Sequence, residues 1–499
     1  MLILSLNRGA RGALIGLTAG VLATGCVAVG PNFRSPPAPA AAGYAMTGDD
    51  VDPAGSAAIG DKVVADWWTL FRSPALDQLM RQAIADNRTL EAARARLSQA
   101  RAATAGEGGR LTADASGGFK REQANLNAFS GGAFSGLPSL PGFSFPTNPE
   151  FNLYSIGTSV SYDLDLFGGA RRRRESLAAD AEAKARELDA AYLTLTGHVV
   201  QQALIIADAS IQADALQDIV EHDQTALAMV QQSRAAGGSS AVDVVDAQAQ
   251  LAQDAAALPA QHQRLAAARH ALAVLVGKAP SEWSPPAFNA ESGVLPAVLP
   301  VSVPSALVHG RPDILEAEAR LHAATAQIGV AEAARYPKIT LNGGYNLDSL
   351  TTHDLFAPTS ASWAIGPALS VPLFHSGELK ARQRAAEAAA RAALADYQQT
   401  VLEAFAQVAD VLQSIAHDNQ VYAEQTRALS AAAQRLDAVR NSYRLGGVSA
   451  LQVVNAERTW RRARLGVSQT ASSRHSDAAM LLLAVATVPP GLSAEPPPK

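Results

Sequence analysis

Two stretches of the chain carry apolar residues at alternating intervals of three and four positions, over 178–230 and 394–443. Spacing sustained for this length predicts helices that pack side by side as coiled coils. A helix over 170–233 would be roughly 95 Å long at 1.5 Å per residue, which is more than a compact domain needs. Four polar residues interrupt the two sets: Gln202, Asp223, Asp418 and Gln425.

A glycine pair and then a serine follow each stretch, in the segments GGSSAVDVVDA (237–247) and GGVSALQVVNA (446–456). Glycine favours the end of a helix and serine the start of the next, so each long helix is expected to turn back as a hairpin. The two segments are 209 residues apart and align without a gap. The chain is therefore interpreted as an internal duplication. Two further pairs of segments are similar: NRTLEAARARL (87–97) with RPDILEAEARL (311–321), and LDLFGG (164–169) with VPLFHSG (371–377).

Four shorter stretches alternate apolar residues with small or polar ones at a period of two, and they predict β-hairpins within 111–167 and 338–374. Segments of about ten residues with one apolar face are typical of transmembrane β-barrels. Alternation alone also fits a soluble antiparallel sheet with one dry face. On the polar face, Asp163 and Asp165 are expected to line a pore. The arginines at 171–174 are expected either to be solvated or to contact lipid phosphates of the inner leaflet.

Four strands are too few to close a membrane barrel. The smallest such barrels have about eight strands, and an open sheet edge in lipid is prohibitive. A barrel therefore requires oligomerisation, in which two copies would supply about eight strands and three copies about twelve.

The N-terminus predicts export. Arg8 and Arg11 precede an apolar run over 13–23, which is too short to span a membrane and has the form of a secretory signal. The run ends in LATGC, and these small residues before Cys26 resemble a bacterial lipobox, in which the cysteine receives lipid. The alternative is an ordinary signal followed by an incidental cysteine. Because Cys26 is the only cysteine in the chain, a disulfide framework is excluded.

Composition narrows the class of protein further. The chain has 499 residues, of which 17% are charged, and a net charge of −5, which argues against a disordered chain and against a nucleic-acid-binding face. A mean hydropathy of +0.03 argues against a helical membrane protein but leaves a β-barrel possible, since alternating strands barely change the average. The histidines form no zinc-type HExxH helix, and no GxSxG or nucleotide-binding motif occurs, so the chain is not expected to be an enzyme.

These patterns divide the chain into two repeats, each expected to contain a helix, a β-hairpin, a long helix and a final helix. The expected segments are a signal peptide (1–25), a lipid-anchored extended segment (26–75), a first repeat (76–277), a Pro-rich linker (278–303), a second repeat (304–487) and a disordered tail (488–499).

Several motifs, in this order and duplicated, resemble the TolC-like outer-membrane efflux factors, and best the lipoprotein branch that serves resistance-nodulation-division pumps. The motifs that carry the resemblance are Cys26, GPNFRSP (30–36), YDLDLFG (162–168), RPDI (311–314), PLF (372–374) and YRLGGVSALQVV (443–454). The resemblance covers nearly the whole mature chain.

The resemblance implies a mixed α and β membrane protein that forms a trimer. Its transmembrane β-barrel would have twelve strands, four from each chain, and would continue into a long periplasmic α-helical barrel. The homotrimer would lie in outer-membrane lipids and would dock on a periplasmic adaptor fed by a proton-driven inner-membrane pump. No metal, nucleic acid or cofactor is implied, apart from the covalent lipid on Cys26.

The resemblance also implies a periplasmic gate just after the second hairpin turn, at Tyr443, Leu451, Gln452 and Asn455. Family members often carry aspartate at the last two positions, whereas this chain has amides. We therefore expect a gate held by hydrogen bonds and Leu451, with weak cation block. Asp243 and Asp246 occupy the equivalent first-half positions and are expected to bond the neighbouring hairpin; the alternative is that these polar residues simply face solvent. The expected adaptor contacts are the hairpin tips Gly237, Gly238, Gly446 and Gly447.

Three functions remain open from the sequence. The first is a channel that passively conducts drugs or other small toxic compounds out of the cell. The second is a channel for type I protein secretion or for metal efflux. The third is a lipid-anchored periplasmic coiled-coil scaffold, which would leave the alternating strands unexplained.

Overall fold

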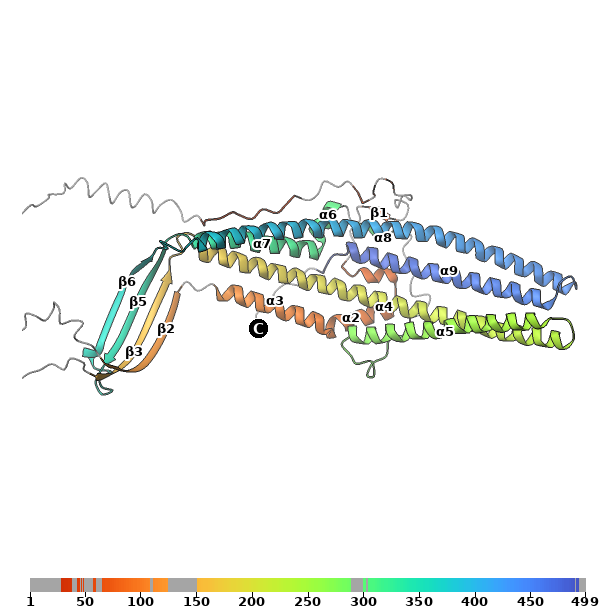
Figure 1. Cartoon of the computed structure of the whole chain (residues 1–499), viewed down its shortest axis with the longest axis horizontal. Helices are drawn as coiled ribbons and strands as arrows, with labels where there is room; N and C mark the ends of the chain where they lie inside the picture. The colour runs from red at the N-terminus through yellow and green to blue at the C-terminus, as the bar shows by residue number, and fades with distance from the viewer. Residues whose placement is uncertain are drawn as a thin grey trace, which may run out of the picture. The chain divides into compact units, whose positions relative to one another are not determined.

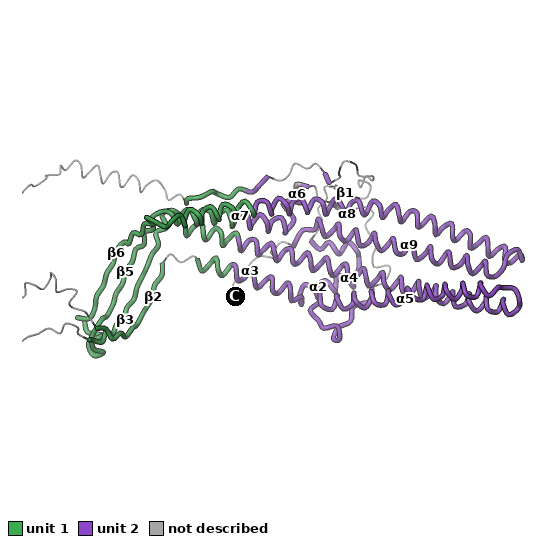
Figure 2. Tube along the Cα trace, in the orientation of Figure 1, with its two compact units in different colours: residues 1–34, 101–179, 322–392 green, residues 35–100, 180–321, 393–499 purple. Residues whose placement is uncertain are grey.

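The structure is a computed structural model that describes residues 28–37, 43–44, 46, 48, 57–59, 65–107, 111–123, 150–288, 299–301, 304–489 and 491–492. Cys26 and the expected signal peptide lie outside the described residues, as does most of the expected tail. The chain forms two compact units, each of them discontinuous in sequence (Figure 2). Unit 1 comprises 1–34, 101–179 and 322–392, and unit 2 comprises 35–100, 180–321 and 393–499.

Helices dominate the fold (Figure 1). The α-helices are α2 (Pro74–Asp86), α3 (Arg88–Gly106), α4 (Gly169–Ala235), α5 (Ala241–Leu275), α6 (Pro304–Gly310), α7 (Pro312–Ala333), α8 (Glu378–Arg444) and α9 (Ala450–Val485), with short 3₁₀ helices η2 (Trp67–Phe71) and η5 (Pro358–Ser360). The strands are β1 (Ala57–Ile59), β2 (Leu111–Gln123), β3 (Glu150–Asp163), β4 (Leu299–Val301), β5 (Lys338–Ser349) and β6 (Ala361–Ser370).

The long helices α4 and α8 reflect the duplication directly. Both have 67 residues, and the 209-residue offset relates their first residues as well as their last. In each case the chain turns and returns as an antiparallel helix, α5 or α9, of 35 or 36 residues. The helix that apolar spacing predicts over 170–233 is thus present and extends to Ala235.

Unit 1 contains an antiparallel sheet of four strands in the order β2-β3-β5-β6. The register pairs Leu111 with Tyr162, Thr158 with Tyr345, and Tyr345 with Trp363, so these side chains share one face. That face is apolar and exposed, with Trp363 75% exposed. The other face carries small and polar residues, as the period of two predicts. The outer edges of β2 and β6 have no strand partner among the described residues.

Both second strands end earlier than the alternation suggested. β3 ends at Asp163, and Asp165 adopts a left-handed φ of 43° instead of lining a pore as part of the strand. Its carboxylate accepts hydrogen bonds from the backbone N–H groups of Ala170 (2.9 Å) and Arg171 (3.0 Å), and so stabilises the first turn of α4. The expectation for Asp165 is therefore wrong, because the start of a helix takes up its carboxylate.

The core of unit 2 includes part of the segment expected to be extended. Trp67 and Phe71 lie on η2 and are almost completely buried, and Trp67 Nε1 donates to Thr196 Oγ1 at 3.4 Å. Burying two aromatic side chains outweighs the preference of a linker for extended backbone. The predicted linker likewise supplies β4, which pairs in parallel with β1.

A buried arginine in unit 1 holds the segment that follows the expected lipid site. Arg172 is 4% exposed, and its guanidinium donates to the backbone oxygens of Val29 (3.1 Å) and Gly30 (3.1 Å), to Asn32 Oδ1 (2.7 Å) and to Glu175 Oε2 (2.8 Å). The expectation that this arginine faces solvent or lipid phosphates is wrong, because these four acceptors bury its charge.

Glycines allow the same segment to approach the helices closely. A Cβ on Gly30 would lie 2.5 Å from the Cα of Gly329, and a Cβ on Gly329 would lie 2.8 Å from the backbone oxygen of Val29. Phe33 stacks on His322 with ring centroids 4.4 Å apart, and His322 Nε2 lies 3.1 Å from Glu175 Oε1. Residues 30–34 of the GPNFRSP motif are thus part of the fold of unit 1.

Replacing Arg172→Ala is expected to release this segment. Two buried carbonyls and Asn32 would lose their donors, at a cost of about 2–4 kcal/mol. Limited trypsin digestion of the folded protein should then cleave after Arg34 faster than in the wild type. Arg173→Ala is the matched control, because Arg173 is exposed and its ion pair with Glu107 lies at the surface. Equal cleavage rates in the two variants would contradict the role assigned to Arg172.

Candidate functional site at the helical hairpins

The two hairpin turns have the same backbone construction. Gly237 and Gly446 adopt left-handed φ values of 79° and 77°, which favour glycine. The next glycine in each turn donates its N–H back to the helix, from Gly238 to the oxygen of Ser233 and from Gly447 to the oxygen of Ser442, both at 2.8 Å. These bonds satisfy the last helical carbonyls as a Schellman motif. The turns are therefore well-defined tips, with open space around Gly237 and Gly446.

The first helical turns after the tips differ between the repeats. Ser240 and Asp243 form a capping box at the start of α5, in which Asp243 Oδ2 accepts the N–H of Ser240 at 2.6 Å. This backbone hydrogen bond lowers the pKa of Asp243. Ser449 and Gln452 occupy the equivalent places at the start of α9, where Ser449 makes no side-chain cap. The carboxylate of Asp243 thus bonds within its own helix start.

The remaining predicted gate residues lie on exposed or half-buried surface. Leu451 is half-buried, and Asn455 follows it by four residues on the same face of α9. Gln452 and Asp246 are exposed, and Tyr443, on the last turn of α8, is 48% exposed. The structure places these side chains within a few turns of the tips. Whether they form a gate stays a prediction.

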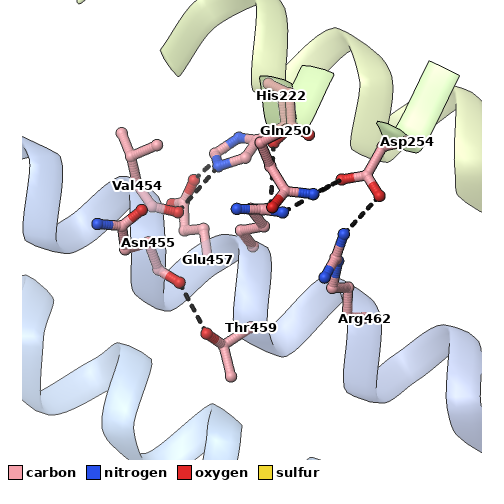
Figure 3. Close-up of polar contacts among 10 residues, drawn as sticks. His222, Gln250, Asp254, Val454, Asn455, Glu457, Thr459 and Arg462 are labelled. Atoms are coloured by element: carbon pink, nitrogen blue, oxygen red, sulfur yellow. Dashed lines mark hydrogen bonds and ion pairs between the residues drawn. The ribbon is translucent and has the colours of Figure 1, made fainter. Parts of the chain in front are cut away.

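A polar network that the sequence did not predict lies beside them and joins α9 to α4 and α5 (Figure 3). His222 on α4 donates through Nε2 to the backbone oxygen of Val454 at 3.1 Å, and its Nδ1 lies 3.5 Å from Glu457 Oε2. Glu457 also pairs with Arg440 of α8. Asn455, a predicted gate residue, lies between Val454 and Glu457 in the sequence, so the network fixes the turn of α9 that carries it.

Asp254 of α5 lies at the centre of the second part of the network (Figure 3). It pairs with Arg462, and its Oδ2 lies 3.4 Å from Arg458 and accepts from Gln250 at 3.1 Å. Arg458 also lies 3.5 Å from Asp223 Oδ1 of α4. The side chains of Asp223 and Asp254 are only 4% and 10% exposed, so these ion pairs are poorly screened by water.

The two aspartates have opposite pKa shifts. Burial raises the pKa of Asp223 to about 6, and a hydrogen bond with Asp254 adds to this effect, whereas Arg458 opposes it. Burial also acts to raise the pKa of Asp254, but the hydrogen bonds from Asp223, Arg462 and Gln250 outweigh it, and the pKa is lowered. Asp223 therefore holds a proton more readily than Asp254.

One sequence signal pointed to this network. Asp223 interrupts the apolar series of α4, and a carboxylate inside a coiled coil requires a polar partner. Its partners come from α5 and α9, and no spacing rule connects them to Asp223. Among the residues that the structure describes, no group of three or more His, Cys, Asp or Glu side chains is arranged to hold a metal ion.

Comparison with known proteins identifies the family. The family described as "Outer membrane efflux protein" matches residues 79–278 and 303–487, which together form most of the chain. The chain is 28% identical over 446 residues to the probable outer membrane lipoprotein SilC of Salmonella typhimurium, covering 89% of this chain and 92% of SilC. It is 29% identical to the cation efflux system protein CusC of Escherichia coli, covering 87% and 90%. It is 31% identical to the outer membrane protein OprJ of Pseudomonas aeruginosa, covering 81% and 80%.

Solved structures show the same fold. The outer-membrane channel OprN superposes with a TM-score of 0.79 at 26% identity, over 92% of this chain and 99% of OprN. The CmeC outer membrane channel of Campylobacter jejuni superposes with a TM-score of 0.78 at 20% identity, over 92% and 94%. The mixed α and β fold expected from the sequence, with two β-hairpins and long helices in each chain, is thereby confirmed.

Asp254→Ala is expected to loosen α9 from α5. Removing this carboxylate leaves Arg458 and Arg462 without their shared partner, at a cost of about 1.5–3 kcal/mol, because Arg462 is 45% exposed and is partly screened by water. Hydrogen exchange of the α9 amides over 450–462 should accelerate accordingly.

Asp218→Ala is the matched control. Asp218 of α4 pairs with Arg461 of α9, but the Asp218 side chain is half exposed. Its removal should therefore change the free energy of opening measured by hydrogen exchange by less than about 1 kcal/mol. If both variants accelerated exchange equally, the buried position of Asp254 would have no special importance.

Proposed function

The chain belongs to the outer membrane efflux protein family and is an outer-membrane channel of a tripartite efflux system; we propose that three copies conduct drugs or other small toxic compounds. The observation that carries this proposal is the family match over both repeats, which includes all four strands of the sheet and both hairpins. The channel supplies a passive path, and the energy comes from the pump.

The open sheet edges support three copies. In lipid, the backbone groups of β2 and β6 require partners, because no water is available to them. The two edge strands run antiparallel to each other, so β6 of one copy pairs with β2 of the next without changing the pattern. Three copies of a four-stranded sheet close a barrel of about twelve strands, whose apolar face meets the lipid.

The hairpin tips are the surface offered to a periplasmic adaptor, which connects the channel to an inner-membrane pump. Next to Gly237, Gly238, Gly446 and Gly447, apolar side chains are exposed. They are Val242 (65%), Val245 (59%) and Leu445 (88%). Exposed apolar side chains beside a rigid turn suit a protein partner better than solvent.

The gate is formed by Tyr443 on the last turn of α8 and by Leu451, Gln452 and Asn455 on the first turns of α9. The neighbouring ion pairs of Arg458 and Arg462 hold this part of α9 against α5, so opening requires that they separate. A gate lined by amides carries no ring of fixed negative charge.

A second candidate substrate is a metal cation. It is favoured by one of the relatives, since the similar CusC is a cation efflux system protein. Deletion of the gene in its own host should distinguish the two candidates: sensitivity to drugs supports the first, and sensitivity to salts of transition-metal cations supports the second. Purified trimer that fails to conduct ions across a planar bilayer would contradict both.

Introducing acidic residues at the gate should create cation block. Gln452→Asp with Asn455→Asp adds about six carboxylates to the trimer, and the concentration of Mg²⁺ that halves the single-channel current should fall about tenfold, equivalent to about 1.4 kcal/mol. The wild-type current should be only weakly sensitive to Mg²⁺.

Asp246→Asn controls for a contribution of the first repeat to this ring. Strong block of the wild type that persists in Asp246→Asn would contradict an amide-lined gate.

Cys26→Ala tests the lipid anchor. We propose that Cys26 is acylated, since it follows a lipobox-like sequence and Val29, three residues later, is held to unit 1 by a hydrogen bond from its N–H to the oxygen of Phe167. Metabolic labelling with a radioactive fatty acid should mark the wild type and not the variant. Label retained in Cys26→Ala would refute acylation at this residue.

A further inference from the structure

Each helical hairpin contains one pair of aspartates that face each other across it. Arg458 of α9 lies 3.5 Å from the carboxylate of Asp223 of α4 and 3.4 Å from that of Asp254 of α5, and the carboxyl group of Asp418 of α8 raises the pKa of Asp477 of α9. Two neighbouring carboxylates are both acceptors and repel each other, so a hydrogen bond between them forms only when one of them carries a proton.

Unpaired atoms within these pairs support the same conclusion. Oδ2 of Asp223 and Oδ2 of Asp418 are buried, and neither has a hydrogen-bond partner among the residues that the structure describes. A buried acceptor without a partner costs free energy, and a proton shared with the second aspartate removes that cost. The Asp223 side chain is only 4% exposed, so water does not substitute for the missing donor.

The surroundings differ between the two pairs. Two arginines of α9, Arg458 and Arg462, face the first pair, together with Gln250 of α5 and His222 of α4.

Fewer positive charges offset the negative charge of the second pair. Arg474 of α9 and His417 of α8 act on Asp418, and Arg474 also donates to Asn419 and lies over the ring of Tyr422. The nearby helix α4 adds Asp208, which is bonded to Ser472 and interacts with His475 and Arg264. Two carboxyl groups with a single arginine leave an excess of negative charge unless a proton is bound.

The duplication shows that coiled-coil packing does not require these carboxyl groups. The positions equivalent to the first pair in the second repeat are Ala432 and Ala463, and those equivalent to the second pair in the first repeat are Ala209 and Ala268. Three of these alanines are buried, and Ala463 is half-buried. At each of the two levels, one repeat therefore builds the helical hairpin with a pair of alanines where the other has a pair of aspartates.

We propose that the two aspartate pairs are proton-binding sites, and that a proton taken up from water by each pair tightens its helical hairpin as the pH falls below neutrality. Proton binding at these pairs changes how tightly the periplasmic helices pack, which is a role distinct from conduction. Each pair binds one proton and forms no covalent bond.

The direction of the effect follows from the pKa values. Burial, helped by the neighbouring carboxyl group, raises the pKa of Asp223 and of Asp477 to about 6, from 3.8. The folded state therefore binds these protons more tightly than the unfolded state. Their stabilising contribution is fully present below the unfolded pKa and is lost as the pH rises through about 6. The lowered pKa of Asp254 acts only at more acid pH.

The test compares the melting temperature of purified full-length trimer between about pH 5 and about pH 7.5. In the wild type, the melting temperature should be higher at the acid end. A quadruple variant replaces each aspartate of the pairs by the alanine of the other repeat, and it should lose about half or more of this difference. Asp437→Ala, at an exposed position of α8, is the control and should leave the difference unchanged.

Two further measurements test for the bound protons if the quadruple variant misfolds. Asp477→Asn mimics the protonated state, and its melting temperature at neutral pH should exceed that of the wild type. Infrared spectra of the wild type should show the carbonyl band of a protonated carboxylic acid that disappears as the pH rises through about 6. Absence of that band, or an unchanged pH dependence in a folded quadruple variant, would overturn the proposal. Bilayer conductance of the same wild-type preparation reports separately on the channel function.

Discussion

The backbone hydrogen bonds at the two free edges of the sheet constrain the rest of this molecule. Among the described residues of one chain, β2 and β6 have no strand partner on their outer edges, and a membrane offers the N–H and C=O groups there no water. The sheet is therefore stable in lipid only after neighbouring copies have paired with it. Since α4 begins at Gly169 and α8 at Glu378, a few residues after β3 and β6, assembly of the strands also brings the long helices of the copies together. The low content of charged residues suits helices that pack closely with other helices over most of their length.

The sequence was sufficient for features that repeat over many residues. The three-and-four spacing predicted α4 and α8, and the period of two predicted the apolar face that Trp363 and Tyr345 share, because both patterns average over many side chains. It was insufficient where one residue's role depends on distant contacts. In the sequence, Arg172 is one of four consecutive arginines. Of these four, it alone is buried, because its guanidinium donates hydrogen bonds to the backbone oxygens of Val29 and Gly30. Asp223 and Asp418 were visible as interruptions of the apolar series, but their partners lie on returning helices, at positions that local patterns do not specify.

The duplication allows the backbone features that both repeats keep to be compared with the side chains that differ between them. Both repeats keep the helix length and the glycine turn, because the Schellman bonds and the returning helix depend on backbone positions. The side chains at equivalent positions are free to diverge. Ser240 and Asp243 form a capping box that Ser449 and Gln452 do not form. The buried aspartate pairs likewise occur at different levels in the two hairpins. Backbone geometry is thus the common constraint, and the polar contacts are specific to each hairpin.

The polar contacts are unevenly distributed along α9, and this determines which part of the helix is able to move. From Ala478 to Val485 its inward face is apolar and buried in the core of unit 2, where displacement would expose hydrophobic surface. Near the tip, by contrast, arginines hold it through Asp223 and Asp254, and these bonds lose little when water and counter-ions replace the partners after separation. A helix fixed by apolar packing at one end and by ion pairs at the other opens first at the ionic end. That end carries Leu451, Gln452 and Asn455, so the position of the proposed gate agrees with the least costly movement of the helix.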